Sequence, residues 1–167
     1  LEKATELGVK KIEPLIMHYS IKKTINMKRC EKIILSAAKQ CKRSYLPILC
    51  EPVKFISWMK KVNGQYLAGY QSTNSQLKNL DLDSSKSINI IIGPEGDYSD
   101  DEINVMQNKN VKFFTLGNRR LRAETAMISS ISILNELLNW DFKLKNCLFC
   151  KIVNSEISAE IVYENER

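Results

Sequence analysis

The sequence has no long apolar runs, so it lacks the signature of a membrane-spanning protein. No stretch approaches the roughly twenty consecutive apolar residues that a transmembrane helix needs, and no signal peptide opens the chain. Hydrophobic residues make up 44% and charged residues 26% of the 167 positions, which is typical of a soluble globular protein. We therefore expect a cytoplasmic protein with one domain of ordinary size and a sizeable core.

Two common nucleotide-binding motifs are absent as well. No predicted strand is followed by a G-x-G-x-x-G turn, which argues against the standard dinucleotide-binding fold, and no Gly-Lys-Ser or Gly-Lys-Thr occurs, which argues against a P-loop. The five cysteines are odd in number, and this usage fits reduced thiols in the cytosol better than a disulfide framework. Cys147 and Cys150 could help to hold zinc, but no second pair of ligands follows, so no metal site is expected.

Acidic residues are scarce near the N-terminus, where positive charge is concentrated. The whole chain has a net charge of +6 and a pI of about 9.0. Residues 1–43 contain eleven Lys or Arg against four Glu, so the rest of the chain is close to neutral. A basic face confined to one region suits the phosphate backbone of a nucleic acid. The alternative is a solvated, lysine-rich surface without a partner.

Strand and helix patterns alternate along the chain. The nearly continuous apolar run Ile88–Ile92 is typical of a strand buried on both faces. Ser99 and Glu102 form a capping box, which predicts a helix from Ser99 to about residue 108. Such alternation predicts an α/β fold with a mainly parallel sheet that carries helices on both faces. The other predicted strands are 12–17, 47–50, 65–70 and 111–116, and the other predicted helices are 1–7, 27–43, 124–140 and one that starts with Pro52 in its first turn.

Two loops combine glycines with charged residues directly after predicted strands. The first is Gly93-Pro94-Glu95-Gly96, and the second is the segment 116–126, which reads LGNRRLRAETA. Ligands of α/β proteins bind where strands end. Glycines there let the backbone approach a ligand closely, and Pro94 stiffens the first loop. The simpler alternative is that each glycine only completes a tight strand-to-helix turn.

Taken in series, the two loops resemble the SPOUT class of S-adenosylmethionine-dependent RNA methyltransferases. The similarity is greatest to the family that methylates N3 of a uridine in 16S ribosomal RNA, whose pattern runs I-G-P-E-G-G and then L-G-x-R-x-L-R-x-E-T-A. Residues 2–9 and 12–15 resemble the segment that opens the catalytic domain of this family, so the resemblance covers roughly residues 1–140. It implies S-adenosyl-L-methionine as cofactor, the small ribosomal subunit as partner, a homodimer, and a C-terminal trefoil knot through which the segment 116–126 threads.

The same resemblance implies roles for individual residues. Methylation of uracil N3 removes a proton and leaves negative charge on O2 and O4, which a cation can stabilise while a carboxylate takes the proton. Arg122 and Glu124 are the candidate catalytic pair; the alternative is that Glu124 only favours the helix N-terminus and Arg122 is its surface partner. The candidate RNA-binding residues are Gln40, Arg43, Arg119 and Arg120, and the candidate cofactor-binding residues are Gly93, Pro94, Glu95, Gly96, Leu116, Gly117, Leu121, Thr125 and Ala126.

Three positions depart from the family pattern. Asp97 replaces the second glycine of G-P-E-G-G and adds a negative charge, so we expect weaker cofactor binding. In a segment that reads approximately A-A-E-Q-C-G-R in the family, Lys39 replaces the acidic residue and Lys42 replaces the glycine. These lysines add positive charge where RNA is expected, and Lys42 puts the local turn in question.

The C-terminal residues differ in character from the rest. Residues 147–153 and 161–167 resemble the beginning of a histidine-triad nucleotide-binding protein. The chain has only His18, however, and lacks the histidine cluster that such a protein needs. We therefore expect a methyltransferase domain at 1–145 and a truncated second domain at 146–167.

These observations leave three functions open. The first is methylation of 16S ribosomal RNA by a homodimeric enzyme. Because the chain starts with Leu1 instead of Met, we expect it to begin inside a longer protein and to lack the N-terminal barrel of the family, which leaves its own activity open. The second is a non-catalytic RNA-binding module, in which a degenerate cofactor loop leaves only the basic face. The third, a nucleotide hydrolase based on the tail, would need residues beyond Arg167.

Overall fold

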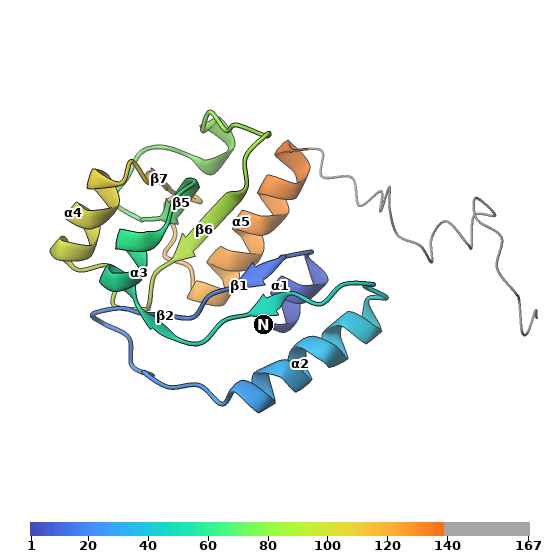
Figure 1. Ribbon diagram of the computed structural model, residues 1–167. Coiled ribbons are helices and arrows are strands. Elements are labelled where there is room, and N and C mark those ends of the chain that lie inside the picture. The colour runs from blue at the N-terminus through green and yellow to red at the C-terminus, as the bar shows by residue number, and fades with distance from the viewer. Residues whose placement is uncertain (139–167) are drawn as a thin grey trace, which may run out of the picture.

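The helices and strands follow an α/β order through residues 1–138, which are the residues that the computed structural model describes (Figure 1). Among these residues every strand pair is parallel, as predicted, and no helix is long and apolar enough to cross a membrane. The predicted second domain, including Cys147 and Cys150, lies outside the described residues. The elements are α1 (Glu2–Glu6), β1 (Lys11–Ile12), β2 (Leu15–Ile16), α2 (Met27–Gln40), β3 (Ile48–Leu49), β4 (Val53–Lys54), α3 (Phe55–Lys61), β5 (Gln65–Gly69), η1 (Leu77–Asn79), β6 (Ile88–Ile92), α4 (Asp100–Asn108), β7 (Lys112–Phe114) and α5 (Ala123–Leu137).

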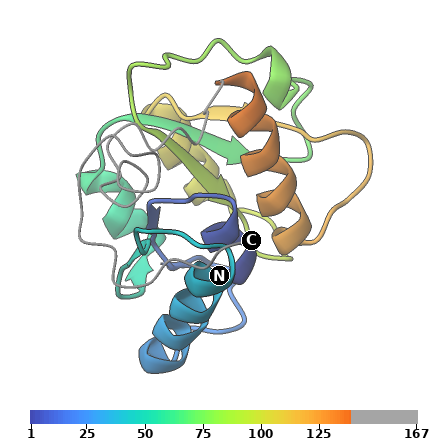
Figure 2. The same ribbon diagram turned by 90° about the vertical axis from the view of Figure 1, so that its right-hand side faces the viewer.

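The largest sheet has three strands in the order β6-β5-β7. Ala68 of β5 packs on one face with buried residues of α3 and α4, whereas its neighbour Leu67 packs on the other face with Leu77 of η1 and Leu134 of α5. Successive side chains of a strand alternate between the two faces, so helices cover both of them (Figures 1 and 2). Within the described residues β6 is an edge strand. Ile91 is the only one of its five residues that is buried, so the predicted burial of this strand on both faces is only partly realised.

The predicted strand 12–17 is divided in two by Pro14. Its first part, β1, pairs with β3, and its second part, β2, pairs with β4. Proline has no N–H group with which to continue a ladder. The carbonyl group of Pro14 instead accepts a hydrogen bond from the N–H of Val53 at 3.1 Å. This pairing keeps Val53 extended, so α3 begins only at Phe55, and the prediction of Pro52 in its first turn is wrong.

Three helices end in the same hydrogen-bonding motif, with a residue of positive φ just after the helix. In α1, α2 and α4 this residue is Gly8 (φ 88°), Lys42 (φ 56°) and Asn110 (φ 55°). Its N–H donates to the carbonyl three residues back, and the N–H of the next residue donates to the carbonyl five residues back, which is the Schellman arrangement. The predicted stop at Gly8 is confirmed, whereas α2 ends at Gln40, before the predicted boundary.

The start of α4 and the buried face of α5 agree with the sequence predictions. The Ser99 hydroxyl accepts from the N–H of Glu102 at 3.4 Å, and the Glu102 carboxylate accepts from the N–H of Ser99 at 2.9 Å, so the capping box is confirmed. Helix α5 begins at Ala123 and buries Ile131 and Leu134, as its period predicted. Helix α4 therefore starts shortly after the first of the loops for which ligand binding is predicted, and α5 starts inside the second, at Ala123.

Candidate functional site

The two predicted loops meet in one cavity of about 330 Å³. It lies where β5, β6 and β7 end, which is the edge of a parallel sheet at which α/β proteins bind ligands. Its volume is near the lower end of the range for ligand pockets, roughly 300–1,000 Å³. The predicted convergence of the loops is confirmed. The cavity is lined by Gly69, Tyr70 and Gln71 at the end of β5 and after it, by Ile92, Gly93, Pro94, Glu95 and Asp97 at the end of β6 and after it, and by Phe114, Thr115, Leu116, Arg119, Arg120, Leu121, Arg122, Ala123 and Ala126, which run from the end of β7 into α5.

The first loop is a tight turn that rests on Tyr98. The N–H of Asp97 donates to the carbonyl of Pro94 at 2.9 Å, which closes the turn. A Cβ at Gly93 would lie 3.1 Å from the ring of Tyr98, so the glycine lets the backbone lie against this ring. The Tyr98 hydroxyl donates to the carbonyl of Ile91 at 3.2 Å, and burial raises the pKa of Tyr98. The turn is therefore supported by a buried, neutral side chain.

The last glycine of this loop is required by a contact with a distant segment. A Cβ at Gly96 would lie 2.7 Å from the Cβ of Tyr19, a distance at which one of the two carbons must move. Gly96 itself does not line the cavity, although both of its neighbours do. Its role in the structure is therefore to let the segment 17–20 lie against the outer side of the loop.

At two positions this chain replaces a glycine of the family pattern with another residue. Both of these residues have a positive φ. The φ of Asp97 is 66° and that of Lys42 is 56°. A carboxylate oxygen of Asp97 accepts from the N–H of Tyr98 at 2.9 Å, and such a local hydrogen bond helps aspartate to adopt this conformation. Both turns therefore form with the replacement residues. The Asp97 carboxylate also adds a negative charge to the cavity wall.

Hydrogen bonds join the second loop to the residues after β5 and to the first loop. Gly117 has a φ of 120°, and its N–H donates to the Thr115 hydroxyl at 3.3 Å. Its carbonyl accepts from the side-chain amide of Gln71, after β5, at 3.1 Å. The guanidinium of Arg120 donates to the carbonyl of Glu95 at 2.6 Å, which joins the second loop to the first. Hydrogen bonds therefore connect all three walls of the cavity.

Most of the predicted cofactor-binding residues line the cavity. Three of them do not: Gly96 contacts the segment before α2, Gly117 forms the turn after β7, and Thr125 is exposed on α5. Their predicted role would be to shape the loops from outside. The predicted residues that do line the cavity are Gly93, Pro94, Glu95, Leu116, Leu121 and Ala126.

Of the two candidate catalytic residues, Arg122 lines the cavity and Glu124 does not. Arg122 is the N-cap residue of α5, and its exposed side chain makes no capping hydrogen bond. Within residues 1–138 no ion pair joins it to Glu124, so the alternative surface pair does not form there. Glu124 lies in the first turn of α5, where the helix dipole favours a carboxylate. Arg122 therefore lines the cavity without forming an ion pair among the described residues.

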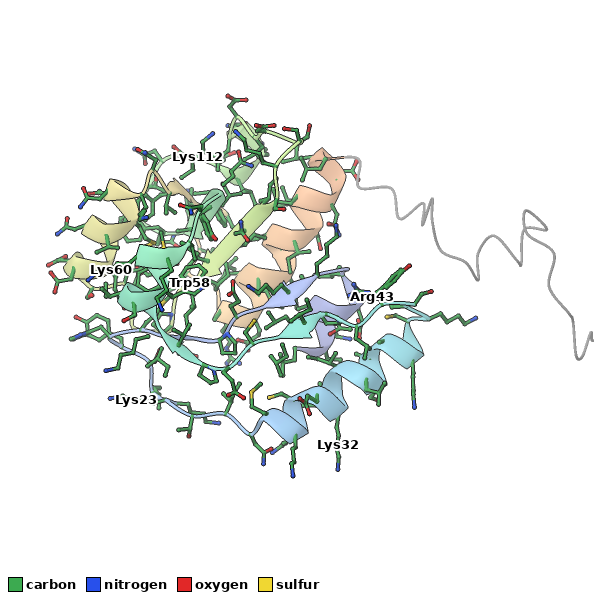
Figure 3. The ribbon with its side chains drawn as sticks, in the orientation of Figure 1. Lys23, Lys32, Arg43, Trp58, Lys60 and Lys112 are labelled. Atoms are coloured by element: carbon green, nitrogen blue, oxygen red, sulfur yellow. The ribbon has the colours of Figure 1, made fainter. Side chains whose placement is uncertain are left out.

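The candidate RNA-binding residues divide between two places. Arg119 and Arg120 line the cavity, whereas Gln40 and Arg43 lie at the end of α2 and do not. Gln40 is exposed. The Arg43 guanidinium lies against the end of α1 (Figure 3), and burial lowers the pKa of Arg43. It donates to the carbonyl groups of Thr5 at 2.7 Å, Val9 at 3.2 Å and Gly8 at 3.4 Å. These carbonyls lie at and just after the end of α1, so Arg43 has an architectural contact that the sequence did not suggest.

Sequence reasoning missed the third wall of the cavity, which is formed by the end of β5 and the residues after it. Gly69, Tyr70 and Gln71 lie there. A signal was present, because residues 65–70 were predicted as a parallel strand and parallel strands end at the same edge of a sheet. The residue types after this strand carry no recognisable motif, however, so only its place in the sheet identifies them.

Named relatives of this chain are ribosomal RNA methyltransferases. A ribosomal RNA small subunit methyltransferase E from Rickettsia conorii is 35% identical over 133 residues, which cover 77% of this chain and 54% of the relative. Another, from Buchnera aphidicola, is 34% identical over 152 residues, which cover 86% and 59%. The crystal structure of the Neisseria gonorrhoeae protein of the same name, bound to S-adenosyl methionine, has a TM-score of 0.73 at 27% identity and covers 81% of this chain and 58% of that one. The chain spans little more than half the length of these relatives.

The family match covers nearly all of the part of the chain that the structure describes. The family of RNA methyltransferase domains matches residues 1–135, from α1 into the last turn of α5. This range contains both loops, the parallel sheet and every residue that lines the cavity. The chain therefore belongs to the family of RNA methyltransferase domains.

Proposed function

We propose that this chain is the catalytic domain of an S-adenosylmethionine-dependent enzyme that methylates N3 of a uridine in 16S ribosomal RNA of the small subunit. One observation carries the proposal: two loops of the predicted pattern line a single cavity, and Arg122 is one of the residues that line it. The names of the relatives and the solved structure with bound cofactor support it. In this proposal the domain covers residues 1–145, and residues 146–167, which resemble the start of a histidine-triad protein, are separate from it.

The residues of the cavity fit an adenosine-containing cofactor. The two loops bring backbone groups and apolar side chains together, and the turn on Tyr98 gives a ligand close access to the backbone of Gly93. When bound, S-adenosylmethionine supplies a methyl group that is activated by a sulfonium charge. The contribution of the protein is to position it. The residues proposed to hold it are Gly93, Pro94, Glu95, Leu116, Leu121 and Ala126, with Gly96, Gly117 and Thr125 supporting the loops.

Arg122 and Glu124 are the proposed catalytic residues. The guanidinium of Arg122 has no counter-ion among residues 1–138, so it is available to stabilise negative charge on O2 or O4 of the uracil. Glu124 lies two residues further along, in the exposed first turn of α5, and its carboxylate takes the N3 proton. Because Glu124 does not line the cavity, the acceptor base must enter from the side of α5 on which this carboxylate lies.

A basic surface on α2 and the segment before it is proposed to bind phosphate groups of the RNA. Its cations are exposed, and Glu31 is the only exposed acidic residue between residues 22 and 42 (Figure 3). Contacts of this kind add affinity without reading sequence, and they weaken with salt. Gln40 lies at the end of this surface, and Arg119 and Arg120 bring positive charge to the cavity. The exposed cations are Lys22, Lys23, Lys28, Arg29, Lys32, Lys39 and Lys42.

Contacts around the second loop support a C-terminal trefoil knot. The N–H of Thr115 donates to the carbonyl of Ser75 at 2.8 Å, and the Arg120 guanidinium donates to the carbonyl of Glu95 at 2.6 Å. The segment 115–122 thus contacts the chain that follows β5 and the chain that follows β6 before α5 begins. We also propose a homodimer in the cytoplasm, as the resemblance to the SPOUT class implies, and light scattering tests the dimer.

Cofactor binding and methyl transfer test the proposed function separately. Titration calorimetry with S-adenosylmethionine tests the cavity, and transfer from a labelled donor to small ribosomal subunits, followed by mapping of the modified base, tests the reaction. Cofactor binding together with a label at uridine N3 supports the proposal. RNA affinity without cofactor affinity would identify a non-catalytic RNA-binding module, the alternative that the carboxylate of Asp97 in the cavity favours.

A further inference from the structure

The segment between β2 and α2 presents two exposed aromatic rings. His18 is exposed, and 49% of the surface of Tyr19 is accessible. The two rings meet edge to face, with centroids 4.6 Å apart and planes at 87°. Two exposed lysines, Lys22 and Lys23, follow at once along the chain. An exposed aromatic ring beside cations is the combination with which proteins bind single-stranded nucleic acid.

A hydrogen bond to a buried carboxylate and a close packing contact hold this segment against the first loop of the cavity. The Glu102 side chain is buried, at 3% exposure, and its carboxylate accepts from the N–H of His18 at 2.9 Å and from the N–H of Ser99 at 2.9 Å. The same carboxylate therefore anchors the aromatic segment and the start of the helix that follows the loop. The Cβ of Tyr19 lies directly over Gly96, whose two neighbours in the chain both line the cavity. The ring of Tyr19 is thus presented beside the cavity on a fixed backbone.

We propose that the ring of Tyr19 stacks on an unpaired base of the RNA that lies next to the cavity. This inference rests on the proposed function and names the part of the substrate that the segment binds. Unpaired bases offer a face to an aromatic side chain, whereas the bases of a duplex are covered by their neighbours. Lys22 and Lys23 are placed to neutralise the adjoining phosphates. Their charge favours RNA over a second copy of this chain, which is itself basic.

Binding of two labelled RNAs by matched variants tests the proposal. Fluorescence anisotropy is measured with an oligouridylate and with a duplex RNA of the same length, for the unmodified chain, Tyr19→Ala, Tyr19→Phe and the control Tyr45→Ala. Tyr45 is also exposed, at 59%, but it lies between α2 and β3 and, unlike Tyr19, is not one of the nearest neighbours of Gly96. Tyr19→Ala should weaken binding of the oligouridylate about 5- to 150-fold, as expected for loss of one stacked base, and leave duplex binding unchanged. Tyr19→Phe, which keeps the ring, should bind like the unmodified chain.

Several results would overturn the proposal. These are absence of oligouridylate binding by the unmodified chain, an equal loss for both RNAs, an equal loss in Tyr45→Ala, or an unchanged affinity in Tyr19→Ala. Calorimetry with S-adenosylmethionine reports whether Tyr19→Ala only disturbs the loop beneath it, and a parallel loss of cofactor binding would assign Tyr19 that structural role. Dissociation of a dimer in this variant, measured by light scattering, would assign the segment to a protein interface. Methyl transfer is not needed for these readouts, so a failure of the proposed reaction is distinguishable from a failure of stacking.

Discussion

Replacement of Arg43 by alanine should lower the free energy of unfolding by about 2–4 kcal/mol. The guanidinium donates to the carbonyls of Thr5 and Val9 at 2.7 and 3.2 Å and to that of Gly8 at 3.4 Å. A hydrogen bond to a charged group contributes roughly 1.5–3 kcal/mol. We count the first two bonds only, because the third exceeds the usual N–H···O distance. The half-buried position of Arg43 reduces the sum further, since water competes for part of the site.

Urea unfolding followed by circular dichroism measures this loss as a lower midpoint with an unchanged slope. Arg43→Lys should lose part of the effect, because an ammonium group cannot reach several carbonyls as a planar fork does. Arg119→Ala is the matched control: this guanidinium has no partner among residues 1–138, so its loss should change stability by less than about 0.5 kcal/mol. An unchanged midpoint in Arg43→Ala together with weaker RNA binding would refute the reasoning and support the RNA-binding role that the resemblance implies.

Other consequences of the structure can be tested in the same preparations. Arg122→Ala should lower methyl transfer about 10²- to 10³-fold without changing the urea midpoint, and undiminished turnover would contradict its catalytic role. Gly96→Ala should weaken cofactor binding in calorimetry, since the new Cβ would lie 2.7 Å from the Cβ of Tyr19 and the loop would have to move. An unchanged affinity would mean that this movement does not disturb the cavity. Lys42→Gly should raise the free energy of unfolding by about 0.5–1 kcal/mol, because glycine adopts a φ of 56° without strain, and a lower urea midpoint would count against this. The Ser85 hydroxyl, which donates to Asp83, is the main cause that lowers the pKa of Asp83 from 3.8 to about 2. The stabilisation from this group is therefore present above pH 3.8 and is lost as the pH falls towards 2, and an ordinary pKa in an NMR titration would disagree with the structure.

Features that depend on residues close together in the chain were predictable from the sequence. The capping box of Ser99 and Glu102 forms because both partners lie within one helical turn. The stop at Gly8 follows from the conformational freedom of glycine at a helix end. The strand Ile88–Ile92 was recognisable from its apolar run, and the alternation of such segments sufficed for a parallel α/β fold. The two loops of the cavity were found because each directly follows a strand.

Features that depend on distant residues were decided only by the tertiary structure. The carbonyl acceptors of Arg43 lie 34 to 38 residues earlier in the chain, and its sequence neighbourhood contains no sign of them. Gly96 is required by Tyr19, which approaches from a segment before α2. A motif records which residue types recur, whereas the atoms that each side chain contacts depend on which elements pack beside it. The sequence by itself therefore determined the local elements and the two loops, and packing between separate elements determined the third wall of the cavity, the contact of Arg43 and the aromatic segment beside the site.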